Sequence, residues 1–68
     1  MNKNSTLFAK IADVSVSVRV VFDYVDDSRI VIRVNNREDA LLTCYCYRGQ
    51  MSTIERAADG GLLVVVKK

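Results

Sequence analysis

Two neighbouring stretches of the chain alternate between apolar and polar side chains, with the period of two that is typical of a half-buried strand. The first stretch covers residues 14–25 and the second covers residues 29–34. Three polar residues, 26–28, separate them. The pattern therefore predicts a β-hairpin, and the other segments of the chain are placed relative to it.

The alternation also predicts how this hairpin pairs. A three-residue loop at residues 26–28 sets aromatic and β-branched side chains against each other on one face, which is a favoured cross-strand arrangement. The expected pairs are Tyr24 with Ile30, Phe22 with Ile32 and Val20 with Val34. A two-residue loop would shift the register by one and set Val20 against Arg33, so we expect the longer loop.

The first strand of this hairpin is long for so small a protein. Twelve extended residues span about 40 Å, whereas a compact chain of this length has a diameter of about 30 Å. Two solutions are open: the strand coils and bulges, with Val20–Val21 as the expected bulge, or it projects and pairs with another chain.

The segments on either side of the hairpin each permit two interpretations. Residues 5–13 place Leu7, Phe8, Ile11 and Ala12 on one helical face, but the strands that follow favour a first strand. Residues 51–58 match a short capping box, yet the Asp59-Gly60 turn favours a hairpin that pairs Ile54 with Val65. Residues 62–66 are apolar on both faces and predict a buried final strand.

Between the hairpin and this last pair of strands lie a polar connection and an apolar run. Residues 35–40 are rich in turn formers, and Asn36 is suited to cap a helical turn through Glu38 and Asp39. Residues 41–47 contain Thr, Cys and Tyr and predict a strand. In that strand Tyr45 and Tyr47 share one face, and the thiols share the other.

These elements define the expected fold class. We predict one small, mainly β domain over residues 1–68, an antiparallel meander of four or five strands curled into a partial barrel or a twisted sheet, with at most one short helix. Half of the residues are hydrophobic and there is no proline, so the chain is too apolar to be disordered.

Charge narrows the classes of function. Ten basic and eight acidic residues give a net charge of +2, and they are scattered, which is weaker than the imbalance typical of nucleic-acid-binding or membrane-surface proteins. Lys10 interrupts the first apolar run, so we expect no secretory signal, no membrane partner and a cytoplasmic protein.

Candidate chemistry is sparse. The chain has no histidine, which removes the commonest general base and metal ligand. Cys44 and Cys46 are expected to be packing residues, because on one strand face their Cβ atoms lie about 7 Å apart, too far for a disulfide. The acidic residues near 23–27 and 38–39 lack the spacing of a calcium loop. We expect neither an enzyme nor a metal or cofactor.

Our first hypothesis is a non-enzymatic interaction module that self-associates, as a homodimer, and binds another protein. A chain of 68 residues buries only about 60 % of its surface, so a further apolar contact would stabilise it. The expected interface uses one face of the long strand and the final strand. Its residues are Val14, Val16, Val18, Leu63 and Val65.

The alternative hypothesis is a small single-stranded nucleic-acid-binding protein. Tyrosines that alternate on a strand, with arginines beside them, stack bases and hold phosphates in many oligonucleotide-binding sheets. The residues that would form this surface are Arg19, Arg33, Tyr45, Tyr47 and Arg48.

Overall fold

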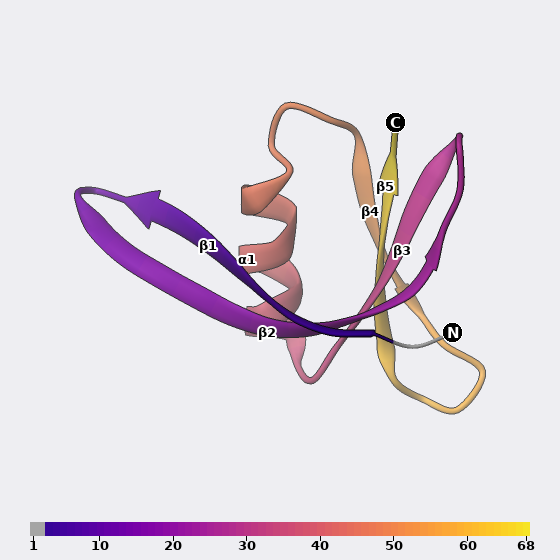
Figure 1. Ribbon diagram of the computed structural model, residues 1–68. Coiled ribbons are helices and arrows are strands. Elements are labelled where there is room, and N and C mark those ends of the chain that lie inside the picture. Colours follow the sequence, from indigo (N-terminus) through magenta and orange to yellow (C-terminus); the bar gives the residue numbers. More distant parts are fainter. Residues whose placement is uncertain (1–2) are drawn as a thin grey trace.

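The computed structural model describes residues 3–68 and contains one five-stranded antiparallel sheet and one helix (Figure 1). The strand order across the sheet is β1-β2-β3-β5-β4. The elements, in chain order, are β1 (Lys3–Ile11), β2 (Val14–Val25), β3 (Arg29–Val34), α1 (Arg37–Cys46), β4 (Ser52–Arg56) and β5 (Leu62–Lys67). The expected fold class is confirmed: the protein is mainly β, with one short helix, and the sheet does not close into a barrel.

β1 and β2 form a hairpin joined by only two residues. Ala12 and Asp13 both have positive φ values, 51° and 66°, as a type I′ turn requires. The right-handed twist of such a turn matches that of the flanking strands, so all nine residues of β1 pair with β2, from Ile11 opposite Val14 to Lys3 opposite Phe22. The strand interpretation of residues 5–13 is therefore confirmed.

The hairpin of β2 and β3 differs from the prediction near its turn. Phe22 lies opposite Ile32 as expected, but a bulge between Phe22 and Tyr24 shifts the register, so that Tyr24 faces Val31. The bulge thus lies nearer the turn than Val20–Val21. Beyond it, Asp26 accepts hydrogen bonds from the backbone N–H groups of Ser28 and Arg29, which closes the loop.

The strand prediction for residues 41–47 is wrong, because this segment forms most of α1. Asn36 caps the helix by accepting a hydrogen bond from the Asp39 N–H at 2.9 Å. Two residues of the helix are fully buried, Ala40 and Thr43. Together with the partly buried Cys44 and Tyr47 they follow the helical spacing i, i+3, i+4, i+7. Burial of this face outweighs the β propensity of the individual residues.

β4 and β5 form the expected hairpin, but their register differs from the prediction, and so does their position in the strand order of the sheet. Ile54 lies opposite Val64 rather than Val65, because the connection is a longer loop in which the Ala57 N–H donates to the Gly61 carbonyl. α1 carries the chain across the sheet, and β5 then returns between β3 and β4. The simple meander therefore ends at β3.

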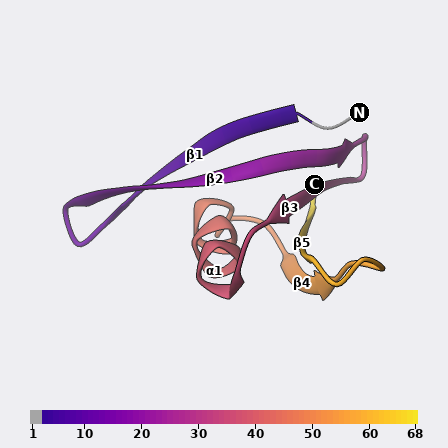
Figure 2. The same cartoon turned by 90° about the horizontal axis from the view of Figure 1, so that it is seen from below.

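The core lies between α1 and one face of the sheet. Figure 2 shows the helix on one side of the β1–β2–β3 layer, with the hairpin turn reaching beyond it. The fully or nearly fully buried apolar residues are Val18, Val20, Ile32, Val34, Ala40, Val64 and Val66. The opposite face of the sheet carries no helix, so Val21, Val31, Leu63 and Val65 there are only half-buried.

Candidate interaction surface

β1 forms one of the two free edges of the sheet. The other edge, β4, has five residues and ends in the charged pair Glu55-Arg56, whereas β1 runs for nine residues without a proline. Charged residues and short lengths protect sheet edges from pairing with other chains. Each edge strand carries two charged residues, so only the length distinguishes them, and the longer β1 is the less protected edge.

The type I′ turn determines which backbone groups of β1 point outward. The residues that flank such a turn, Ile11 and Val14, form a pair that exchanges two hydrogen bonds, and every second pair after it does the same. The backbone groups of the odd-numbered residues of β1 therefore point to β2. Those of the even-numbered residues point away from the sheet, and these are Asn4, Thr6, Phe8 and Lys10.

Side chains of α1 cover part of this edge. The Tyr45 hydroxyl donates to the Lys10 carbonyl at 3.3 Å, and the Cys46 thiol lies 3.8 Å from the Phe8 carbonyl in a weak hydrogen bond. Both acceptors belong to the outward set, in agreement with the turn geometry. The edge is thus partly covered near the turn, whereas Asn4 and Thr6 keep outward N–H and C=O groups.

Four large apolar side chains stand exposed on the same hairpin, and two of them, Phe8 and Val14, lie in the half that contains the turn between β1 and β2. The ring of Phe8 is 76 % exposed, on the face of β1 that α1 does not cover. Val14, at the turn, is 60 % exposed. An exposed aromatic side chain beside unpaired backbone groups is typical of a surface that binds another polypeptide.

An open depression of about 570 Å³ lies beside the uncovered part of the edge. It is on the sheet face opposite α1, and among the described residues no carboxylate lines it. Its lining includes Asn4, Thr6, Arg19, Val21, Arg33 and Asn35. Hydrogen-bond donors and two guanidinium groups thus face one hollow.

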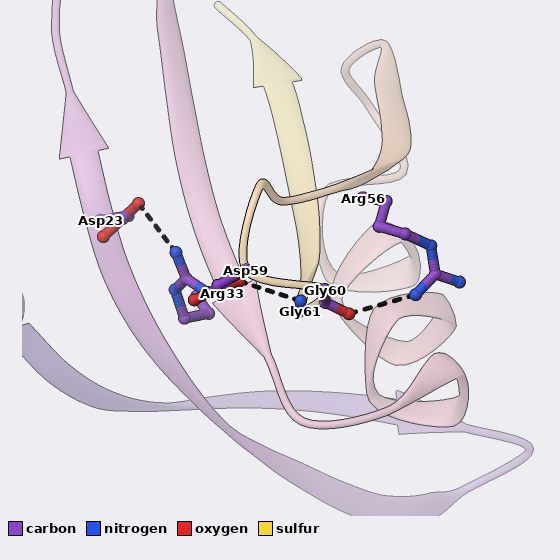
Figure 3. Close-up of polar contacts among 6 residues, drawn as sticks. All are labelled: Asp23, Arg33, Arg56, Asp59, Gly60 and Gly61. Atoms are coloured by element: carbon purple, nitrogen blue, oxygen red, sulfur yellow. Dashed lines mark hydrogen bonds and ion pairs between the residues drawn. The ribbon is translucent and has the colours of Figure 1, made fainter.

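Two carboxylates hold Arg33 in place (Figure 3). Its Nη1 atom lies 3.0 Å from Asp59 Oδ2, and its Nη2 atom lies 3.8 Å from Asp23 Oδ2. The side chain also passes close to Gly61, where a Cβ atom would lie 2.9 Å from Nη1. The Gly61 N–H, followed by the Arg33 guanidinium, lowers the pKa of Asp59 below its usual value. Arg33 is therefore a fixed cation, whereas Arg19 is exposed.

The charges of the first hairpin are nearly balanced. β1 and β2 with their turn hold three basic residues, Lys3, Lys10 and Arg19, and two acidic residues, Asp13 and Asp23. The hairpin therefore carries +1 of the net charge of +2, and the rest of the chain carries the other +1. Asp13 lies in the turn and Asp23 pairs with Arg33, so neither carboxylate pairs with Arg19 among residues 3–68.

The residues predicted for a self-association interface do not form one surface. Val18 is 5 % exposed beneath α1, and Val14 and Val16 share its face of the sheet. Leu63 and Val65 lie on the opposite face. These five residues therefore lie on two opposite faces of the sheet, and the prediction that they form an interface would require contacts on both faces.

The residues predicted for nucleic-acid binding are also divided. Arg19 and Arg33 lie on the uncovered sheet face, but Tyr45 and Tyr47 belong to α1 and its C-cap. The ring of Tyr47 packs against the core. Tyr45 stacks on the guanidinium of Arg48, 4.7 Å from the ring centre. A strand surface with alternating tyrosines is thus not present.

Cys44 and Cys46 are free thiols in α1. Cys44 packs against the core, and partial burial raises the pKa of the Cys46 thiol. Within residues 3–68 no group of three or more potential metal ligands lies together. In the same part of the chain no helix is long and apolar enough to cross a membrane.

The pattern of residues 3–11 does not indicate that this strand lies at an edge, so Asn4, Thr6 and Phe8 are not among the predicted site residues. The pattern of a strand shows its two faces and not its neighbours. In comparisons with protein-family models, with curated proteins and with solved structures, nothing matches the chain. The candidate surface therefore rests on the geometry of this molecule alone.

Proposed function

We propose that this protein is a non-enzymatic interaction module that binds other polypeptides by adding a strand to the free edge of β1. The observation that carries the proposal is the outward backbone of Asn4 and Thr6, next to the exposed ring of Phe8. Strand addition supplies affinity through main-chain hydrogen bonds and specificity through alternate side chains.

β1 of a second copy of the chain is one strand that could add to this edge. Pairing of the two β1 strands would produce the expected self-association. Because α1 covers the carbonyls of Phe8 and Lys10, the segment with both N–H and C=O groups free is Asn4–Thr6. In the antiparallel two-fold register centred on Ser5, Asn4 of each chain exchanges two hydrogen bonds with Thr6 of the other. The two sheets then become one continuous sheet.

The test is the oligomeric state of the wild type and of Thr6→Pro. Proline removes an outward N–H without breaking a bond to β2, which is the position in a sheet where proline is tolerated. We expect sedimentation velocity to show a dimer that forms with rising concentration in the wild type and is lost in Thr6→Pro. The matched control is Ser52→Pro at the first residue of β4, on the other edge, which should dimerise like the wild type.

Two results would contradict the self-association. One is a wild type that stays monomeric at every concentration, and the other is a dimer that survives Thr6→Pro. Circular dichroism of each variant establishes that the sheet is intact, so that loss of the dimer is not loss of the fold.

Nucleic-acid binding remains the second hypothesis from the sequence, but no observation in the structure favours it over protein binding. Its stacking surface requires Tyr45 and Tyr47 beside Arg19 and Arg33, and these residues lie on different elements and different sides of the sheet. Titration with a single-stranded oligonucleotide is therefore a control in the experiment below.

A further inference from the structure

We propose that the partner preferred by β1 is an acidic segment of another protein, which adds as an outer strand and places carboxylates over the depression that contains Arg19 and Arg33. This inference rests on the proposed function, since it names the chemistry of the strand that the edge receives. It follows from three features of the hairpin: its free backbone, the place of the depression and the distribution of charge.

The backbone determines where the side chains of an added strand lie. In an antiparallel pair, residues directly opposite each other point to the same face. Every second residue of a strand paired with Asn4 and Thr6 would therefore lie on the uncovered face, at the rim of the depression. Arg19 is opposite Thr6 on β2, so it lies two strand spacings, about 10 Å, from such a residue. An arginine and a glutamate side chain together span that distance.

Charge distinguishes an acidic partner from a second copy. β1 carries Lys3 and Lys10 and has no acidic residue. A second copy therefore brings more positive charge to the edge and no carboxylate to the depression. Arg19 makes no ion pair within residues 3–68, whereas Arg33 already has two carboxylate partners. Electrostatic complementarity thus favours a strand with carboxylates on one face.

The experiment uses three labelled peptides as probes, each as long as β1. One alternates Glu and Val, the second alternates Gln and Val, and the third alternates Lys and Val. Fluorescence anisotropy follows their binding to the full chain at low and moderate salt. We expect the Glu peptide to bind more tightly than the Gln peptide by roughly threefold to tenfold, with a difference that shrinks as salt rises, and the Lys peptide to bind least.

Two pairs of variants distinguish the contribution of backbone hydrogen bonds to peptide binding from the contribution of charge. Thr6→Pro should abolish binding of the Glu peptide, whereas Ser52→Pro should not change it. Arg19→Glu should reverse the order of affinities, so that the Lys peptide binds better than the Glu peptide. Arg29→Glu makes the same change in net charge at the other end of the same sheet face, on β3, and should leave the order unchanged.

Each outcome decides between the two proposals. If the Gln and Glu peptides bind equally well and Thr6→Pro abolishes both, strand addition stands and the acidic preference is overturned. If no peptide binds and the wild type is monomeric, strand addition itself is overturned. If a single-stranded oligonucleotide binds more tightly than the Glu peptide and Arg19→Glu abolishes that binding, the depression serves phosphates, and the inference of an acidic protein partner is wrong.

Discussion

Ala12 occupies a backbone conformation that alanine rarely adopts. Its φ of 51° and that of Asp13, 66°, lie in the left-handed region, where a Cβ atom crowds the following carbonyl at a cost of about 1–2 kcal/mol. Asparagine tolerates this region better, so Ala12→Asn should raise the free energy of unfolding by about 0.5–1 kcal/mol. Urea denaturation measures the change.

The matched control for this turn is Ala58→Asn. Ala58 is also exposed in a loop, but its φ is not positive, so the substitution should change stability by less than about 0.5 kcal/mol. An equal gain in both variants would refute the strain at Ala12. The sequence did not predict this turn, because Ala-Asp lacks the Asn-Gly signature by which two-residue hairpin loops are found.

Asp26 makes the loop between β2 and β3 sensitive to acid. Its carboxylate accepts hydrogen bonds from the Ser28 N–H, the Arg29 N–H and the Ser28 hydroxyl, which hold the pKa of Asp26 well below its usual range. Because the folded state lowers this pKa, the stabilisation is complete above the unfolded pKa of about 4 and is lost as the pH falls further.

We therefore expect Asp26→Asn to be less stable than the wild type at neutral pH, and the difference to shrink as the pH falls below about 4. Urea midpoints measured across that range give the comparison. Asp27→Asn is the control in the same loop, since Asp27 accepts none of these three bonds. A difference between Asp26→Asn and the wild type that stays constant with pH would refute the role of the carboxylate.

At the scale of elements, the strands were predictable and the helix was not. Alternation of apolar and polar residues predicts β2 and β3, a run that is apolar on both faces predicts β5, and Asn36 is suited to cap a helix. The run from Thr43 to Tyr47 is rich in strand formers, however, and its helical spacing appears only when Ala40 is counted as a core residue. Small residues carry little weight in a pattern of hydrophobicity, although here Ala40 is the point where α1 meets the sheet.

Ala40 and Leu41 test this helix directly. Ala40 is fully buried, so Ala40→Leu should overpack the core and lower the free energy of unfolding by about 1–3 kcal/mol. Leu41 is larger and more apolar but 53 % exposed, and Leu41→Ala should cost less than about 1 kcal/mol. Chemical denaturation gives both values. The helix buries the small Ala40 and exposes the larger Leu41. A larger loss of stability at Leu41 than at Ala40 would therefore contradict the helix.

At the scale of the whole molecule, strand order was beyond prediction. The pattern of each strand indicates which side chains are buried, but the edges of the sheet depend on how α1 crosses it and on where β5 inserts. The candidate site follows from that order, because β1 is accessible only as an outer strand. For the same reason the predicted interface joined residues from opposite faces, among them Val18 and Val65.

Val18 and Val14 show how the centre and the end of one strand differ in their contribution to the fold. Val18 is 5 % exposed in the centre of the core, whereas Val14 points to the same face but is 60 % exposed at the turn. Val18→Glu buries a carboxylate without a partner, at a cost of several kcal/mol, which is comparable to the whole stability of a domain this small.

We therefore expect Val18→Glu to be unfolded by circular dichroism and by the dispersion of its backbone amide NMR spectrum, and Val14→Glu to keep the fold with a loss of less than about 1 kcal/mol. A folded Val18→Glu that has lost only its ability to dimerise would contradict the burial of Val18 in the core and would support its predicted position in an interface. Val14→Glu changes the charge at the turn and leaves the edge at Asn4–Thr6 unchanged. Strand addition at that edge should therefore persist in this variant.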